Sequence, residues 1–242
     1  LVRAGADADT ALLLAASRGN DTTAAQTAVA TLLRVGAKTT AKLKSGHFPL
    51  SLAATFGYAG TIAALLRGGA DVDAANKKGV TALALATVQG HTDAIGALVR
   101  GGADSTLSMF MAVEKDSDDV IDALVRGGAD PNVKQKKKGS SALMIAAYQG
   151  KNVAVRALIR AGADVNARDD NGQTALFYAV IAEQRKAIEA LLQNGADPSL
   201  KGTGGAVKGR TPLDFAENPK YGDKDVASLL RSEAGGTERM TP

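Results

Sequence analysis

The chain has 242 residues, of which 45% are apolar and only 4% are aromatic, and it has no cysteine. The absence of cysteine excludes disulfides, thiolate metal sites and cysteine nucleophiles. The net charge of +4 is modest for this length, so charge can matter only where it is concentrated. No stretch reaches the roughly 18–20 uncharged apolar residues of a membrane span, so we expect a soluble chain and, without any targeting signal, favour the cytoplasm.

A short pattern recurs along the whole chain. Its most regular part is Gly-Ala-Asp or a close variant, and the glycines of successive copies lie 31, 33, 33, 26, 34 and 33 residues apart, at Gly5, Gly36, Gly69, Gly102, Gly128, Gly162 and Gly195. Apolar pairs such as Leu65-Leu66 precede these glycines, with an apolar partner three or four residues earlier. This spacing predicts an amphipathic helix in each copy of a repeat array.

A second, shorter helix is predicted before each of these. Threonine or serine caps its start, as in residues 81–83 and 211–213, and Pro49 or Pro212 at the first helical position loses no needed donor. Gly90 is placed where a tight turn joins the two helices, and the glycine of Gly-Ala-Asp can close the second helix in the left-handed conformation. Between copies, Ser45-Gly46, Lys78-Gly79 and Asn171-Gly172 are typical of hairpin turns.

This combined pattern resembles the ankyrin repeat over essentially the whole chain. The fullest copies run from Asn76 to Asp104, with Gly79, Thr81, Leu83, Gly90 and His91, and from Ala167 to Asp197. The resemblance implies an all-α repeat solenoid, in which antiparallel helix pairs stack side by side and β-hairpin fingers project from them.

The copies divide one solenoid of residues 1–235 into seven repeats. We place them at 8–38, 39–71, 72–104, 105–130, 131–164, 165–197 and 198–235, after the end of an upstream repeat at 1–7 and before a flexible tail at 236–242. Repeats one and four lack a seven-residue finger, and repeat seven has a more polar second helix that suits a terminal cap. The first repeat shows no such cap, so we expect that a longer array or another domain precedes Leu1.

The sequence offers no convergent set of catalytic groups. Its two histidines, His47 and His91, lie more than one repeat apart. We expect His91 to hydrogen-bond within its turn and His47 to be a solvated loop residue. The aspartates of Gly-Ala-Asp lie in separate turns, so they cannot supply the six to eight oxygens of one calcium site. We therefore predict a protein that is not an enzyme, with no catalytic residue, metal or cofactor.

Basic residues concentrate in the predicted fingers. Lys134, Lys136, Lys137 and Lys138 lie in one finger, and stacking should align them with further cations along one edge of the array, including Lys77, Lys78 and Arg168. Asp169 and Asp170 interrupt that edge. Two interpretations stay open: a solvated face that keeps the protein soluble, or an edge that steers an acidic partner.

The family resemblance also implies which helix positions touch partners. These are the two residues between Ala-Ala and glycine on each first helix, which on the concave face include Phe56, Val88, Gln89, Tyr148, Gln149 and Ile181. Phe56 and Tyr148 are candidate anchors because buried aromatics tend to dominate interface energy. The competing interpretation is that they only pad neighbouring helices.

Our leading hypothesis is a noncatalytic protein–protein interaction module or scaffold that binds another protein, one with an acidic surface, through the concave face and the basic finger edge. One alternative is polyanion binding by the same lysines, to nucleic acid or an acidic membrane. No stacking aromatics interleave the lysines, which makes nucleic acid the weaker candidate. Another alternative is the assembly or targeting part of a larger enzyme complex. The sequence does not identify the partner or the oligomeric state.

Overall fold

The structure is a computed structural model that describes residues 7–18, 21–218 and 223–237. The predicted end of an upstream repeat, apart from Asp7, and residues 238–242 of the predicted tail lie outside these residues. The described part contains fourteen α-helices and a short 3₁₀ helix, and it has no β-strand beyond isolated bridges. The all-α repeat fold predicted from the sequence is confirmed. No described helix is both long and apolar enough to cross a membrane.

The helices follow one another in pairs. They are α1 (Ala8–Arg18), α2 (Thr23–Arg34), α3 (Pro49–Phe56), α4 (Ala59–Arg67), α5 (Ala82–Gln89), α6 (Thr92–Arg100), α7 (Thr106–Glu114), α8 (Asp118–Gly127), α9 (Ala142–Gln149), α10 (Asn152–Arg160), α11 (Ala175–Ile181), α12 (Arg185–Gln193), α13 (Pro212–Ala216) and α14 (Lys224–Thr237), with the 3₁₀ helix η2 (Gly205–Val207) before α13. We call the first helix of each pair inner and the second outer.

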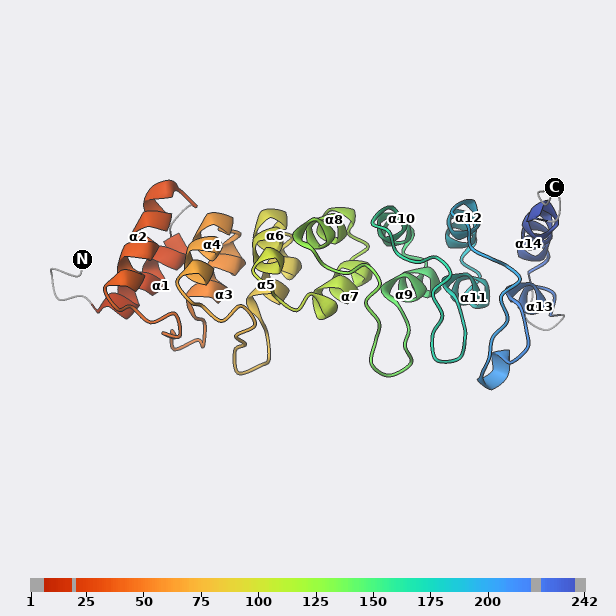
Figure 1. The fold of residues 1–242 in the computed structure, drawn as a ribbon, viewed down its shortest axis with the longest axis horizontal. Helices are drawn as coiled ribbons and strands as arrows, with labels where there is room; N and C mark the ends of the chain where they lie inside the picture. Colours follow the sequence, from red (N-terminus) through yellow and green to blue (C-terminus); the bar gives the residue numbers. More distant parts are fainter. Residues whose placement is uncertain (1–6, 19–20, 219–222, 238–242) are drawn as a thin grey trace. The chain divides into compact units, whose positions relative to one another are not determined.

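The chain divides into two compact units, residues 1–111 with 122–130 and residues 112–121 with 131–242. In the first unit α1 packs on α3 and α3 on α5, while α2 packs on α4 and α4 on α6. In the second unit α9 packs on α11 and α11 on α13, while α10 packs on α12. Within each unit the inner helices form one layer and the outer helices another, and loops project beyond the inner layer (Figure 1).

The loops before α5 and α9 each contain an isolated antiparallel bridge, Ala75 with Thr81 and Lys134 with Ser141. The loop before α13 has a parallel bridge between Gly202 and Lys208 and contains η2. These bridges are the closest approach to the predicted β-hairpin fingers in the described residues. The absence of a finger from repeats one and four stays a prediction.

Hydroxyl side chains begin several inner helices, as predicted. Thr81 accepts a hydrogen bond from the Ala84 amide at 3.2 Å, and Ser141 accepts one from the Met144 amide at the same distance. Thr211 does so for Asp214 at 3.2 Å, ahead of Pro212 at the first helical position. Thr174 differs, because its buried hydroxyl makes no capping bond although the residue occupies the N-cap position. The caps satisfy amides that lack a partner within the helix.

The turn between inner and outer helix takes two forms. Gly57, Gly90 and Gly150 end α3, α5 and α9 in the left-handed conformation, with φ of 77°, 75° and 68°. In three other pairs a residue with a side chain holds this conformation, with φ of 50° at Asp21, 53° at Asp116 and 56° at Glu183. Aspartate tolerates this region better than most residues.

The two aspartates at these turns cap a helix of the next pair. Both carboxylate oxygens of Asp21 accept backbone amides at the start of α4, from Gly60 at 3.0 Å and Thr61 at 2.9 Å. The Asp116 carboxylate accepts the Ala154 amide in the first turn of α10 at 2.7 Å. Each bond satisfies an otherwise unpaired amide and places negative charge at the positive end of the helix dipole. A side chain of one pair thereby fixes its neighbour.

A second set of hydrogen bonds links successive Gly-Ala-Asp turns. The side chain two residues after the aspartate accepts the backbone amide at the aspartate position of the next copy. Asp73 accepts the Asp104 amide at 3.0 Å, and Asn132 accepts the Asp164 amide at 2.8 Å. Asn166 repeats the contact with the Asp197 amide at 2.8 Å. Two of these bonds are exposed and the third is part-buried, so each is modest in energy, but the same contact repeats between neighbouring copies and sets their spacing.

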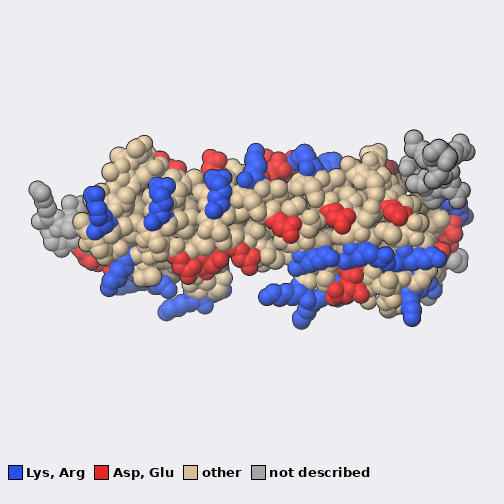
Figure 2. Space-filling view, viewed as in Figure 1, with Lys and Arg blue, Asp and Glu red and all other residues tan. Residues whose placement is uncertain are grey.

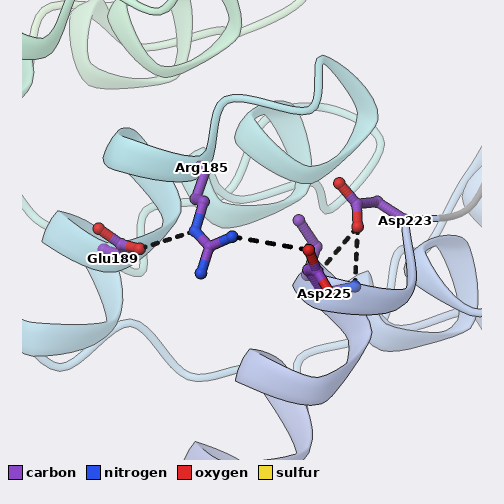
Figure 3. Close-up of polar contacts among 5 residues, drawn as sticks. Arg185, Glu189, Asp223 and Asp225 are labelled. Atoms are coloured by element: carbon purple, nitrogen blue, oxygen red, sulfur yellow. Dashed lines mark hydrogen bonds and ion pairs between the residues drawn. The ribbon is translucent and has the colours of Figure 1, made fainter.

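The last helix pair has a polar attachment in addition to its packing. Asp223 caps α14 by accepting the amide of Asp225 at 2.8 Å. Arg185 at the start of α12 pairs with Glu189 at 3.0 Å and with Asp225 at 3.8 Å (Figure 3). The hydrogen bond to Glu189 raises the pKa of the Arg185 guanidinium above its ordinary value. Because Arg185 is largely exposed, these pairs orient α14 but contribute little stability.

The cap at Asp116 leads to a stability prediction. Asp116→Ala removes the α10 cap and leaves a less tolerant residue in the left-handed region, so it should lower the free energy of unfolding by about 1–2 kcal/mol. Asp116→Gly should cost less because it relieves the backbone, and Asp116→Asn should be nearly neutral. Urea unfolding followed by circular dichroism measures all three variants.

Glu183 supplies the control for this series. It has the same backbone conformation, and its carboxylate makes no hydrogen bond or ion pair in the described part of the chain. Glu183→Ala exchanges one Cβ-bearing residue for another that the left-handed region disfavours about equally, so it should change the free energy of unfolding little. Equal losses for the alanine variants at the two positions would show that the Asp116 cap contributes nothing.

Candidate functional site

All thirteen residues that the sequence nominates for partner contact are exposed. The first unit holds Phe56, Lys77, Lys78, Val88 and Gln89, and the second holds Lys134, Lys136, Lys137, Lys138, Tyr148, Gln149, Arg168 and Ile181. They come from loops and from the ends of inner helices. The nominated residues therefore form two sets, one in each unit. The set in the second unit makes more hydrogen bonds and ring contacts with its surroundings.

The three loops of the second unit are joined edge to edge by backbone hydrogen bonds. The carbonyl of Lys138 accepts the Asp170 amide at 3.1 Å, and the carbonyl of Asn171 accepts the Thr203 amide at 2.7 Å. The loops approach so closely that a Cβ added at Gly139 would lie 2.6 Å from the Asp170 carboxylate. The loops before α9, α11 and α13 therefore form one continuous ledge.

Cations line the base of this ledge. The Lys134 ammonium donates to the Arg168 carbonyl at 2.9 Å, and the Arg168 guanidinium donates in turn to the Lys201 carbonyl. Figure 2 shows the resulting band of lysine and arginine side chains across the loop bases below α9, α11 and α13. Lys136, Lys137 and Lys138 add three exposed cations at the tip of the first loop. Because carbonyls are neutral, these contacts hold the cations in place without cancelling their charge.

Asp169 does not interrupt this band. Its side chain turns inward, and the residue is only 8% exposed. It accepts hydrogen bonds from the amides of Asn171 and Gln173 at 2.9 and 2.8 Å and from the Tyr178 hydroxyl at 2.9 Å. The expectation that two acids break the basic edge is therefore wrong for Asp169, and of that pair only Asp170 is exposed.

Tyr178 connects the ledge to the inner helices. Its hydroxyl lies 3.1 Å from the Ser140 hydroxyl at the base of the first loop, and its ring meets the Tyr148 ring edge to face at 6.1 Å. Burial is the main cause of the raised pKa of Tyr178. The hydrogen bond with Ser140 lowers this pKa in part, and the hydrogen bond to Asp169 and the negative charge of Asp169 raise it again. Tyr148 and Ile181, half-exposed on α9 and α11, continue the surface.

The corresponding surface of the first unit is smaller. Phe56 is 49% exposed and stacks on Tyr58 with ring centroids 5.7 Å apart. Val88 at the end of α5 is 48% exposed. Phe56 and Tyr148 thus each contact one neighbouring aromatic ring and leave about half of their surface open. Each side chain can therefore pack on a neighbour within the domain and still contact a partner.

The histidines have structural environments. His91 Nε2 lies 3.0 Å from the Thr55 carbonyl, and its ring packs where a Cβ on Gly57 would have to sit. His47 Nδ1 lies 3.5 Å from the Ser51 hydroxyl and is half-buried, so His47 is less solvated than the sequence suggests. Among the described residues, no group of three histidine, aspartate or glutamate side chains could hold a metal ion.

A groove with a volume of about 1100 Å³ lies away from the nominated residues, on α1 and α2. Alanine, leucine and threonine dominate its lining, with Arg18 as the charged residue. The matching face of α5 is covered by α3: Ala86 is fully buried, whereas Ala15 at the same position of α1 is half-exposed. The groove thus has the composition of a surface on which another helix packs, and it lacks the convergent polar groups of a small-molecule site.

Comparison with known families agrees with this arrangement. The family model for ankyrin repeats in three copies matches residues 23–108 and again residues 109–202. The chain belongs to the ankyrin repeat family. The comparison with curated proteins gives no match.

Solved ankyrin repeat domains share the fold. The domain of Bcl-3, described as a unique member of the IkappaB protein family, is 26% identical with a TM-score of 0.71 and covers 93% of this chain and 100% of its own. An ankyrin repeat domain from Acinetobacter baumannii AYE is 29% identical with a TM-score of 0.61, over 76% of this chain and 97% of its own. That of human ASB11 is 23% identical with a TM-score of 0.59, over 92% and 96%, and shows the fold alone.

Sequence reasoning missed the residues that organise this ankyrin repeat surface. Asp169, Tyr178 and Ser140 form the hydrogen-bonded link between ledge and helices, yet none was nominated. Asp169 was mistaken for a surface acid because its neighbour Asp170 is one. The Asp-x-Asn-Gly pattern at 169–172 could have identified it, since an aspartate two residues before Asn-Gly commonly accepts the amides of its own turn.

The Tyr178 environment predicts a stability change at high pH. Because the folded-state pKa is raised, the folded chain keeps the phenol proton at a pH where the unfolded chain releases it. The stabilisation that the protonated Tyr178 gives the folded chain is therefore complete below the pKa of about 10 in the unfolded chain, and it is lost as pH rises through the pKa in the folded chain. Urea unfolding of Tyr178→Phe between pH 8 and 11 should show a shallower decline than the wild type.

A spectroscopic titration is the companion measurement. The chain has four tyrosines, and tyrosinate absorbance should show a component that titrates late and disappears in Tyr178→Phe. At neutral pH the same variant should lose about 1–2 kcal/mol, because Asp169 loses a hydrogen-bond donor while buried. An unchanged titration curve would contradict the assigned environment.

Proposed function

We propose that this ankyrin repeat domain is a noncatalytic protein-interaction module that binds an acidic protein segment on the second unit. Ankyrin repeat domains are generally protein–protein interaction modules and are typically noncatalytic. The observation that carries the proposal is the hydrogen-bonded ledge, which holds Lys134 and Arg168 in place and is connected through Tyr178 to the half-exposed Tyr148.

The ledge supports rapid, oriented association. Its cations are held by backbone carbonyls and by loops that are bonded to one another, so little ordering is left for the moment of binding. A fixed cluster of like charge raises the encounter rate with an acidic partner and orients it. The three lysines at the loop tip extend this field outward.

The inner-helix face supports affinity. Tyr148 and Ile181 are exposed apolar groups beside a polar rim, which is the arrangement of residues that dominate binding energy once buried. Gln149 is oriented by its hydrogen bond to Glu114 at 3.0 Å. In the first unit we propose Phe56, Lys77, Lys78, Val88 and Gln89 as a smaller contact surface of the same kind.

The alternative to protein binding is that the same lysines bind a polyanion, either nucleic acid or an acidic membrane.

Peptide selection tests the proposal without a known partner. Random displayed peptides selected on the protein should be enriched in aspartate and glutamate beside an aromatic or aliphatic residue. The best peptide is then measured by stopped-flow fluorescence. Lys136→Glu with Lys137→Glu should slow its association about tenfold at low salt and flatten the salt dependence, because the steering field is reversed locally.

The matched control is Lys42→Glu with Lys44→Glu, which makes the same charge change on exposed loop residues of the first unit. It should slow association less than twofold. Equal slowing by both variants would mean that only net charge matters, and would remove the second-unit ledge as the site. Tighter binding of anionic vesicles or DNA than of any selected peptide would favour polyanion binding.

Tyr148→Ala should act on the other half of the surface. Loss of a buried aromatic should raise the dissociation rate of the selected peptide about tenfold or more while leaving the association rate nearly unchanged. Leu107→Ala is the control, since Leu107 is an apolar residue of the first unit that is 61% exposed. Indistinguishable dissociation from the wild type and the Tyr148 variant would exclude Tyr148 as an anchor.

A further inference from the structure

A row of arginines crosses the outer helices of the first unit. Arg34, Arg67 and Arg100 occupy the last turns of α2, α4 and α6, and all three are exposed. In the described part of the chain none of the three forms an ion pair. Basic side chains stand over these helices, one beside the next, in Figure 2. This surface belongs to the outer layer and shares no residue with the site proposed above.

Helix stability alone does not account for the row. The dipole of a helix favours a cation in its last turn, but lysine would serve that purpose as well as arginine. The equivalent arginine of the second unit is used differently, because Arg160 on α10 pairs with Asp118. The last turn of α12 has no basic residue. The row therefore presents three guanidinium groups whose hydrogen-bond donors are open to a ligand.

Shallow grooves connect these arginines. The groove between α2 and α4 has Arg34 and Arg67 on its walls, and the groove between α4 and α6 has Arg67 and Arg100. Small residues line the rest, including Ala64 and Ala97. A further groove continues from Arg100 to Arg126 on α8, and Asp93 lines it as an acid. The uninterrupted basic part is thus the two grooves that share Arg67.

The floor of these grooves is shaped by glycine. Gly68 packs so closely on Leu33 that a Cβ would lie 2.3 Å from a methyl carbon, and Gly101 packs on Leu66 with a corresponding distance of 2.5 Å. Larger residues at these two positions would fill the space between neighbouring outer helices. The close packing leaves a low, apolar floor on which an extended main chain can lie.

We propose that this row binds an extended acidic peptide segment whose carboxylates recur at every third residue. Packed helices lie about 8–10 Å apart. A chain in the extended polyproline II conformation advances about 3.1 Å per residue with three residues per turn, so every third side chain faces the same way and one turn spans one helix spacing. Planar guanidinium groups pair with carboxylates in a bidentate manner, which rewards correct spacing. A nucleic acid strand fits less well, since the linings of these grooves contain no aromatic residue on which a base could stack.

Two peptides of identical composition test the spacing. Each has nine residues of glycine and serine with three glutamates, placed at positions 2, 5 and 8 in one and at 4, 5 and 6 in the other. Fluorescence anisotropy of the labelled peptides on the full chain at low salt should give at least fivefold tighter binding of the spaced peptide. Equal binding of the two peptides would overturn the proposal.

Variants locate the binding on the row. Arg67→Gln should weaken the spaced peptide about threefold or more and R34Q/R67Q/R100Q at least tenfold, whereas the matched variant Arg156→Gln, on exposed α10 surface, should have no effect. R34K/R67K/R100K keeps the charge and the dipole interaction and should still lose several-fold, because lysine cannot bind bidentately. Unchanged affinity in the Arg67 and triple glutamine variants, or tighter binding of a single-stranded oligonucleotide than of the spaced peptide, would overturn the proposal. Circular dichroism melting of each variant verifies the fold.

Discussion

A helix pair in this chain is too small to bury its own apolar surface, so it depends on the pair beside it. The inner helices pack on inner helices and the outer helices on outer ones, and the large buried residues, such as Leu83, Ile95 and Leu98, lie between these layers. Apolar packing of this kind is strong but tolerant of small sliding movements. It stabilises contact between neighbouring helix pairs without fixing how far one pair is shifted along the other.

Polar bonds between copies supply the missing register. A carboxylate or amide side chain of one copy accepts a backbone amide of the next, both at the helix starts and at the Gly-Ala-Asp turns. These bonds are directional, and an unmet amide at the part-buried helix starts is costly. The loops of the second unit are also joined across copies, there by hydrogen bonds between backbone groups, so the surface available for binding is a product of the stacking itself.

The repeat pattern was sufficient to predict the helix pairs, because apolar spacing, capping hydroxyls and turn glycines act within about ten residues of one another. Pro49 and Thr81 begin their helices as expected. The exposed candidates were found by the same local reasoning. What the sequence did not reveal depends on residues about one copy apart: Ser140 and Tyr178 lie 38 residues apart and meet only through stacking. The arginines of the row were likewise present in the sequence, but the surface that they share could not be predicted, since its grooves form between helices of different copies.

The aspartate caps at the turns also bear on how the array comes apart. Where the turn carries Asp21 or Asp116, opening one copy leaves a helix start of the next without its acceptor, so the two copies tend to open together. Where the turn is glycine, as at Gly90, the turn residue has no side chain that could cap a helix of the neighbour. At Gly57 the neighbour supplies a different contact, from His91 to the Thr55 carbonyl at 3.0 Å. The array is therefore a chain of unequal links, in which local opening stops more readily at glycine turns than at aspartate turns. Partial opening of either unit would then expose defined groups of copies instead of fraying evenly from one end.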